Sequence, residues 1–303
     1  MRVTVVCSTA RLGGLDITLH GLANQTRKPD LFVLVDEWWH LRFKHRLEAR
    51  LPFPVLHVFP GFDGFGISRI GRGHNFGALH ARDGLVIFMN DWMWVQPGWI
   101  ERMAGYAERN PGWTLSGAQF RYDLSDVLEI DILTSLRPGA SIDGLFNGRQ
   151  PIFKDYRENL VKAAAPEGLD ELNPYFWFGG INDSILVEHW NAIGGTDERY
   201  DGAGGGQDID LAFRASRLGA RFAFDPALIN HEIRGPAHEQ VACHRCPVAT
   251  RQHGVAFVMQ FMADYHKRIA EEGAPVDWRK DISEVLIPGM NIAHRVVEKE
   301  AVS

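Results

Sequence analysis

"RVTVVCSTARLGGLDITLHGLANQTRKPDLFVLVDE", residues 2–37, carries the clearest sign of how this chain folds. Its two ends, 2–9 and 30–37, are short runs of β-branched and other apolar residues, which favour buried strands. Between them, the apolar spacing of residues 15–22, with Pro29 as a stop, predicts one helix. A strand, a helix and a strand in this order form a β-α-β unit, in which the strands are parallel and ligands bind at their carboxyl ends.

The alternation of strands and helices continues along the chain. Strands are predicted at 53–60 and 84–90, and a glycine-rich loop and a helix over 73–82 lie between them. A later strand is predicted at 221–232, whereas residues 115–175 show no clear pattern. Strands that alternate with helices indicate an α/β protein with a mostly parallel sheet.

The composition is typical of a soluble globular protein. The chain has 303 residues, of which 45% are hydrophobic, enough for one large core or two small ones. No apolar run approaches the roughly 20 residues of a membrane span, and residues 1–10 reach a polar loop after a few apolar residues, so we expect neither a membrane anchor nor a signal peptide. The net charge of -6 gives no general attraction for polyanions. Because Cys7, Cys243 and Cys246 are an odd number, we expect reduced thiols and a cytoplasmic protein rather than a secreted disulfide framework.

Polar side chains follow three of the predicted parallel strands. If the strands are neighbours, these side chains converge at one edge of the sheet, where a ligand would bind. A helix cap or a turn after each strand is the alternative explanation for any one of them. The six residues are Ser8, Thr9, Asp36, Glu37, Asn90 and Asp91.

The stretch from 176 to 232 is longer and more specific. It contains GG at 179–180, GGTDERY at 194–200, QDIDLAFR at 207–214 and a strand that leads to His231. This succession resembles the family 2 glycosyltransferases of the GT-A fold.

The resemblance covers about residues 2–232 and has consequences for fold and function. It implies an α/β fold of GT-A type over 1–232, with a Rossmann-like, mostly parallel central sheet flanked by helices. Beyond the resemblance, the apolar face of a helix predicted at 255–273 leads us to expect a helical C-terminal extension over 233–303, packed on the same domain. The resemblance also implies an inverting glycosyltransferase of the hexosyltransferase type. Such an enzyme moves a sugar from a nucleotide diphosphate sugar, with a UDP-sugar as first choice, to an acceptor hydroxyl.

By the same resemblance, several residues are expected to bind the donor. Thr9 and Asp36 match positions that contact uridine, with Asp36 accepting a hydrogen bond from the base. Asn75 matches the asparagine of a family loop, and Arg72 could supply a positive charge because His74 stands where the family has arginine. The remaining positions expected on the donor side are Asn90, Asp91, Trp92, Gly180 and Gln207.

A departing diphosphate needs charge neutralisation, for which a divalent cation held by carboxylates is the usual means. In an alignment with the family's Asp-x-Asp motif, Asn90 and Trp92 occupy the positions of the two aspartates. Asp91, the middle residue, is then the one carboxylate in the motif. We expect Mn²⁺ or Mg²⁺ near Asp91 with His231 as a second ligand, as the resemblance implies. Weak metal affinity, or a His231 that is merely solvated, is the alternative.

Inversion requires a base that takes the proton of the acceptor hydroxyl. The family assigns this role to the second acid of a Glu-Asp pair, which here is Gln207 and Asp208. Asp208 is therefore the expected catalytic base, and it could also cap the helix that begins there. Asp210 and Arg214, four residues apart on this helix, are expected to form an ordinary ion pair.

Two further features concern the indoles and the C-terminal cysteines. Trp92 is expected to stack on a sugar or a base, whereas Trp99 is expected in the core. Cys243 and Cys246, flanked by histidines, could hold a structural Zn²⁺ or remain reduced thiols.

The acceptor is open: a glycan, a small molecule or a hydroxymethylated base in DNA, as in some phage enzymes. Arginines near the cysteines could meet a phosphate-bearing acceptor. A non-catalytic nucleotide-sugar-binding module is a second possibility, favoured by the loss of the Asp-x-Asp acids. A nicotinamide oxidoreductase is disfavoured because STARLGG, residues 8–14, lacks the G-x-G-x-x-G pattern.

Overall fold

The computed structural model describes residues 1–9, 14–37, 51–60, 70–124, 126, 146, 148–173, 181–198 and 207–234. All of these residues belong to one compact unit of the chain. Among its helices, none combines the length and the apolar character that crossing a membrane requires. The extension expected over 233–303 lies outside the described residues, apart from the last two residues of strand β11.

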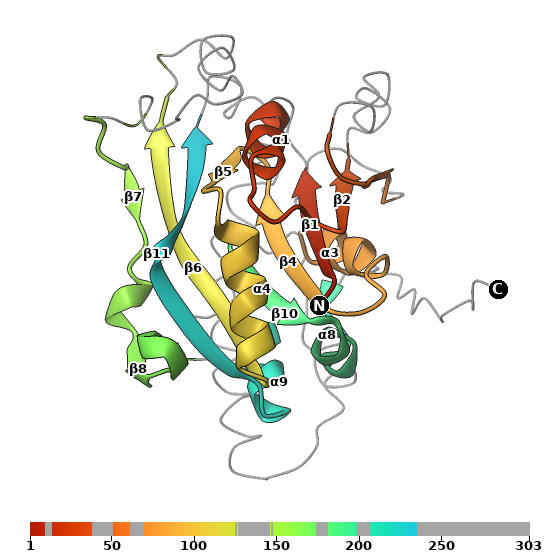
Figure 1. Ribbon diagram of the computed structural model, residues 1–303, viewed down its shortest axis with the longest axis vertical. Helices are drawn as coiled ribbons and strands as arrows, with labels where there is room; N and C mark the ends of the chain where they lie inside the picture. The colour runs from red at the N-terminus through yellow and green to blue at the C-terminus, as the bar shows by residue number, and fades with distance from the viewer. Residues whose placement is uncertain are drawn as a thin grey trace, which may run out of the picture. The chain divides into compact units, whose positions relative to one another are not determined.

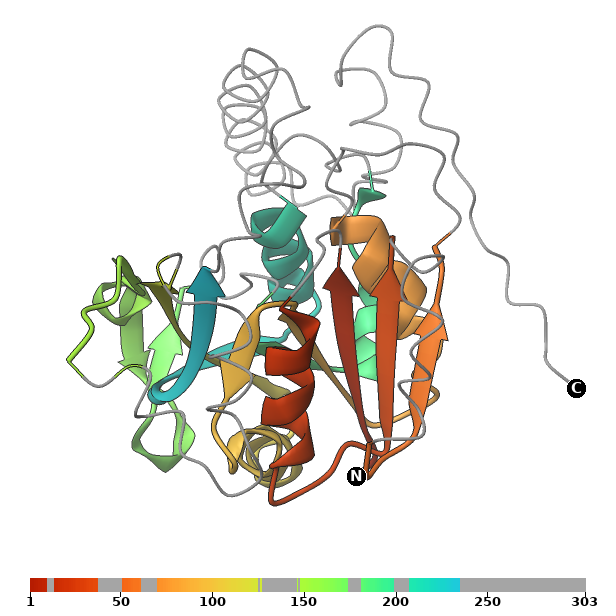
Figure 2. The same cartoon turned by 90° about the horizontal axis from the view of Figure 1, so that it is seen from above.

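The first half of the sheet consists of four parallel strands in the order β3-β2-β1-β4. The register pairs Thr9 with Asp36 and Ser8 with Asn90, so the carboxyl ends of β1, β2 and β4 lie at the same edge. Figure 2 shows β1 and β2 side by side with their arrowheads at this edge. The strands are β1 (Val3–Thr9), β2 (Leu31–Asp36), β3 (Val55–Val58) and β4 (Leu85–Asn90).

The second half of the sheet is mixed. β10 lies antiparallel between β4 and β6, and β11 runs parallel to β6. The long strands β6 and β11 lie side by side in Figure 1, and β5, β7, β8 and β9 add short antiparallel pairings. The bounds are β5 (Met93–Val95), β6 (Trp113–Asp123), β7 (Phe153–Lys154), β8 (Val161–Ala164), β9 (Asp170–Leu172), β10 (Asp183–Leu186) and β11 (Arg221–Arg234).

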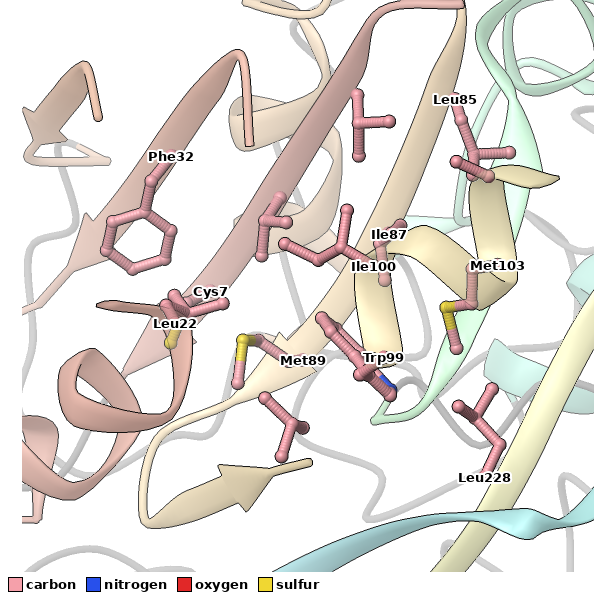
Figure 3. Close-up of a cluster of buried hydrophobic side chains, with 14 of the residues drawn as sticks. Cys7, Leu22, Phe32, Leu85, Ile87, Met89, Trp99, Ile100, Met103 and Leu228 are labelled. Carbon is pink, nitrogen blue, oxygen red and sulfur yellow. The ribbon is translucent and has the colours of Figure 1, made fainter. Parts of the chain in front are cut away.

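Helices cover both faces of the sheet, as its doubly buried parallel strands require. Residues of α1 and α4 form one core cluster with the strands, and residues of α3, α8 and α9 form another. Figure 3 shows the first cluster, in which Trp99 lies among Met89, Ile87 and Ile100. The helices are α1 (Leu15–Ala23), α3 (Ile70–Ala78), α4 (Trp99–Arg109), α8 (Val187–Ile193) and α9 (Gln207–Arg217), with 3-10 turns η3 (Arg157–Asn159) and η4 (Pro166–Gly168).

The expected class is confirmed: the chain is an α/β protein with a central sheet flanked by helices. The β-α-β unit of residues 2–37 is also confirmed, as β1, α1 and a parallel β2. We refer below to the edge formed by the carboxyl ends of β1, β2 and β4 as the carboxyl edge, and to its two sides as the α1 face and the α3 face.

Candidate functional site

Three of the polar strand ends meet on the α1 face of the carboxyl edge. The Thr9 hydroxyl donates a hydrogen bond to Asp91 Oδ2 over 2.5 Å, and Thr9 is paired with Asp36 across the sheet. Thr9 and Asp91 are each 1% exposed and Asp36 is fully buried. Of the six side chains expected to converge at this edge, Thr9 and Asp91 are in direct contact, and Asp36 lies beside Thr9 in the sheet register.

Asp36 has a partner that sequence reasoning missed. His57, in β3, places its Nε2 atom 2.9 Å from Asp36 Oδ2, and both side chains are almost completely buried. A lone histidine in a short strand gives no sign of such a pair, because Asp36 lies 21 residues away in the chain. The pair fixes the orientation of the Asp36 carboxylate.

The first turns of α3 lie against the end of β1 on the other face. A Cβ at Gly73 would lie 2.2 Å from Ser8 Oγ, so only glycine allows this approach. His74 follows, fully buried against Phe88 with ring centroids 4.6 Å apart. Burial lowers the pKa of His74 to about 3, so that it is neutral at physiological pH and cannot replace the charge of an arginine. Asn90, two residues after Phe88, shares this α3 face.

Asn75 holds the loop at 194–198 against α3. Its Nδ2 donates to the Thr196 carbonyl over 2.7 Å and to Glu198 Oε1 over 3.1 Å, and its Oδ1 accepts from the Thr196 N–H over 2.8 Å. Arg72 Nε lies 3.9 Å from Glu198 Oε2. Asn75 and Arg72 were predicted at the site, whereas Glu198 was not.

Helix α9 places Asp208 toward the carboxyl edge. β10 pairs antiparallel with both β4 and β6, so β6 and the parallel strand β11 run in the same direction as β4. β11 therefore starts, at Arg221, on the side of the sheet opposite the carboxyl edge. Since α9 leads directly into β11, its first residues lie toward the carboxyl edge and its last residues toward the opposite edge. Asp208, partly buried in the first turn, accepts a hydrogen bond from the Ile209 N–H over 3.0 Å. Its position at a helix N-terminus stabilises its negative charge.

The expected ion pair of α9 is confirmed. Arg214 Nε donates to Asp210 Oδ2 over 2.8 Å, and Arg214 Nη1 donates to the Ile193 carbonyl at the end of α8. Both side chains are buried, so the pair anchors α9 to α8. Gln207 occupies the first position of the helix.

His231 lies in an aromatic cluster. Its ring stacks on Phe146 with centroids 4.9 Å apart, and Trp94 and Tyr122 lie at 5.4 and 5.7 Å. β11 pairs with β5, which begins two residues after Asp91. Asp91 and His231 thus come from adjoining segments, but in the described part of the chain no three His, Cys, Asp or Glu side chains are grouped to hold a metal.

The expectation for Trp92 is wrong and that for Trp99 is confirmed. Trp92 is 0% exposed, so its ring is not available to stack on a sugar or a base. Its backbone φ of 61° also takes the chain out of the extended conformation, in which Trp92 and Trp94 would share one face. Its ring lies where a Cβ of Gly14 would be, and it packs with Ile17. Trp99 is buried in the core and donates to Asn182 Oδ1 over 2.6 Å.

Gly180, Cys243 and Cys246 lie outside the described residues, and with them the two-glycine loop and the possible zinc site.

Comparison with known proteins supports the fold. No family model and no curated protein sequence matches the chain. A crystal structure of GalNAc-T7 with UDP, GalNAc and Mn²⁺ is similar with a TM-score of 0.55 and 14% identity, over 85% of this chain and 48% of that one. A crystal structure of S. aureus TarS gives a TM-score of 0.49 and 14% identity, over 77% and 37% of the two chains. The chain thus spans about half the length, or less, of these two proteins. It shares its mixed α/β fold with the GT-A glycosyltransferase GalNAc-T7.

Proposed function

We propose that this protein is an inverting glycosyltransferase that moves a hexose from a UDP-sugar to an acceptor hydroxyl. The observation that carries the proposal is the convergence of Thr9, Asp36 and Asp91 at the carboxyl edge, toward which the first turn of α9 also brings Asp208. In open α/β sheets, ligands bind at this edge. The fold shared with GT-A glycosyltransferases, one of them crystallised with UDP and Mn²⁺, supports the same assignment.

The nucleoside is assigned to the end of β2. An ionised carboxylate only accepts hydrogen bonds, and it has about four acceptor positions on its two oxygens. Asp36, oriented by His57, therefore suits a base that donates an N–H, such as uracil. Thr9 lies next to it in the sheet and can contact the same nucleoside.

A divalent cation fits these residues when the donor supplies the other ligands. Mg²⁺ is often held by one or two carboxylates together with substrate phosphates. Asp91 offers a carboxylate, and His231 offers an imidazole from the strand that pairs with β5. When bound, Mn²⁺ or Mg²⁺ would neutralise charge on the diphosphate.

The transfer itself needs only one base from the chain. Asp208 accepts the proton of the acceptor hydroxyl, whose oxygen attacks the anomeric carbon. The bond between this carbon and the diphosphate oxygen breaks, and the diphosphate leaves with the electron pair. Gln207 beside Asp208 is neutral, so no second carboxylate lies next to the base in the sequence.

A non-catalytic binding module is the second candidate. It is favoured by Asn90 and the buried Trp92, which stand where the family has its two acids. Both candidates require UDP binding, and only the first requires turnover.

Hydrolysis of UDP-glucose, UDP-galactose and their N-acetyl forms separates the two candidates. We expect UDP release by the wild type that Mn²⁺ increases and that falls by at least about 100-fold in Asp208→Asn, as for loss of a general base. Asp16→Asn, an exposed acid in the first turn of α1, is the matched control. UDP binding without turnover in any variant would assign the chain to the binding module.

A further inference from the structure

The loop at 194–198 is held on α3 by hydrogen bonds from both polar atoms of the Asn75 side chain. Both the carbonyl oxygen and the amide nitrogen of the Asn75 side chain bond to the backbone of Thr196, at 2.8 and 2.7 Å. The side chain thereby pairs with a backbone segment as a neighbouring strand would. We call this arrangement of Asn75 and Thr196, together with Gly195, the Asn75 clasp.

Gly195 shows that the clasp is built into the sequence. Its φ is +71°, and a Cβ there would lie 2.4 Å from Asn75 Oδ1 and 3.2 Å from Trp190 Nε1. Any larger residue would therefore push Asn75 away from Thr196. The close fit on both sides means that the loop has a single position relative to α3.

The clasp also holds the carboxylate of Glu198. Asn75 Nδ2 donates to Glu198 Oε1 over 3.1 Å, and Arg72 Nε lies 3.9 Å from Oε2. The Glu198 side chain is 40% exposed, although the amide that orients it is partly buried. Glu198 is thus a fixed carboxylate that still reaches solvent, which is how a binding group loses little entropy when its ligand arrives.

The position of Glu198 points to the donor rather than to a remote surface. Gly73 lies against Ser8 at the end of β1, so Arg72 and Glu198 lie at the level of the carboxyl edge. Asn90 shares this α3 face, and α9 carries Asp208 toward the same edge. The nucleoside is assigned to the α1 face by Asp36. A sugar that extends from it toward Asp208 would reach the α3 face.

We propose that Glu198 binds a hydroxyl group of the donor sugar and that Asn75 is the positioning residue that orients it. The inference rests on the proposed function and adds its sugar-binding group. Carboxylates accept strong hydrogen bonds from hydroxyl groups, and a sugar offers several. Asn75 then acts on the sugar through Glu198 and does not itself contact the nucleotide.

The test compares the dissociation constants of UDP and of UDP-hexoses by calorimetry in Mn²⁺, for the wild type, Glu198→Gln and Asn75→Ala. Glu198→Gln is expected to weaken UDP-hexose about tenfold, as for loss of a charge-assisted hydrogen bond, and to change UDP less than twofold. Asn75→Ala should shift the ratio of the two constants in the same direction. Glu188→Gln is the matched control, because Glu188 is an exposed glutamate of α8 that makes no hydrogen bond or ion pair with the described residues.

Three other outcomes would overturn either the proposed function or the role of Glu198. A wild type that binds neither UDP nor UDP-hexose overturns the proposed function, and this inference with it. A wild type that binds both, with the same ratio of constants in Glu198→Gln, overturns the role of Glu198 alone. A melting temperature of Glu198→Gln well below that of Glu188→Gln would show a structural carboxylate and would also overturn it.

Discussion

Replacing Gly195 by alanine is expected to break the Asn75 clasp, and the structure allows the cost to be divided into two parts. The first part is the backbone: at φ +71° an alanine is strained by about 1 kcal/mol. The second part is the collision of the new Cβ with Asn75 Oδ1, at 2.4 Å. If Asn75 moves away, its two hydrogen bonds with Thr196 are lost, at about 1 kcal/mol each. The expected loss in the free energy of unfolding is about 3 kcal/mol.

Gly219 provides the control that isolates the backbone part. Its φ is +85°, and no atom of the described residues lies within 4 Å of the position that a Cβ would take. Gly219→Ala should therefore cost only about 1 kcal/mol. The difference of about 2 kcal/mol between the two variants measures the clasp itself.

The measurement is equilibrium unfolding in urea, completed by a double-mutant cycle. In an Asn75→Ala background the collision no longer exists, so Gly195→Ala should cost about 1 kcal/mol there, which is a coupling energy of about 2 kcal/mol. Equal costs for Gly195→Ala and Gly219→Ala, or a coupling energy near zero, would refute the clasp as an energetic unit.

Three further predictions concern buried polar groups. Tyr106 is buried in α4 with no partner for its hydroxyl among the described residues, and burial raises its pKa to about 12. Tyr106→Phe should leave the free energy of unfolding unchanged or raise it by about 1 kcal/mol, measured in urea, and a marked loss would reveal a hidden partner. Burial lowers the pKa of His74 from 6.5 to about 3 in the folded chain. Between pH 6.5 and 3, His74 is therefore protonated in the unfolded chain and neutral in the folded chain. As the pH is lowered from 6.5 to 3, this group should reduce the free energy of unfolding by up to about 1.4 kcal/mol per pH unit. A His74→Leu variant whose free energy of unfolding depended on pH as steeply as that of the wild type would contradict this. His57→Ala should weaken UDP binding about tenfold in calorimetry by releasing Asp36, and an unchanged affinity would leave the pair a purely structural contact.

The first half of the fold could be predicted because it is local. The strands β1, β2 and β4 are buried on both faces, so 2–9, 30–37 and 84–90 are continuous apolar runs that stand out from their surroundings. β6 gave no such signal, because its Ser116 and Gly117 meet partners distant in the chain. Ser116 donates to Asp183, and a Cβ at Gly117 would strike the Leu228 carbonyl.

The site was predictable only where its residues follow strands. Thr9, Asp36 and Asp91 could be found because parallel strands end together. Glu198 and Trp92 depend on contacts that no local pattern contains. Glu198 is oriented by a residue 123 positions earlier.

Trp92 illustrates the limit of a periodicity argument. Alternation with Trp94 places both indoles on one face only if the chain is extended, and the positive φ of Trp92 breaks that condition. The ring is then accommodated against Gly14, 78 residues earlier in the chain, where a side chain would leave it no room.

A crystal structure of the chain with UDP and Mn²⁺ tests the central claim most directly. We predict uracil within hydrogen-bonding distance of Asp36, the diphosphate beside Asp91, and Asp208 facing the position from which an acceptor would attack. UDP bound elsewhere on the protein, or Asp208 turned away from the diphosphate, would contradict the account.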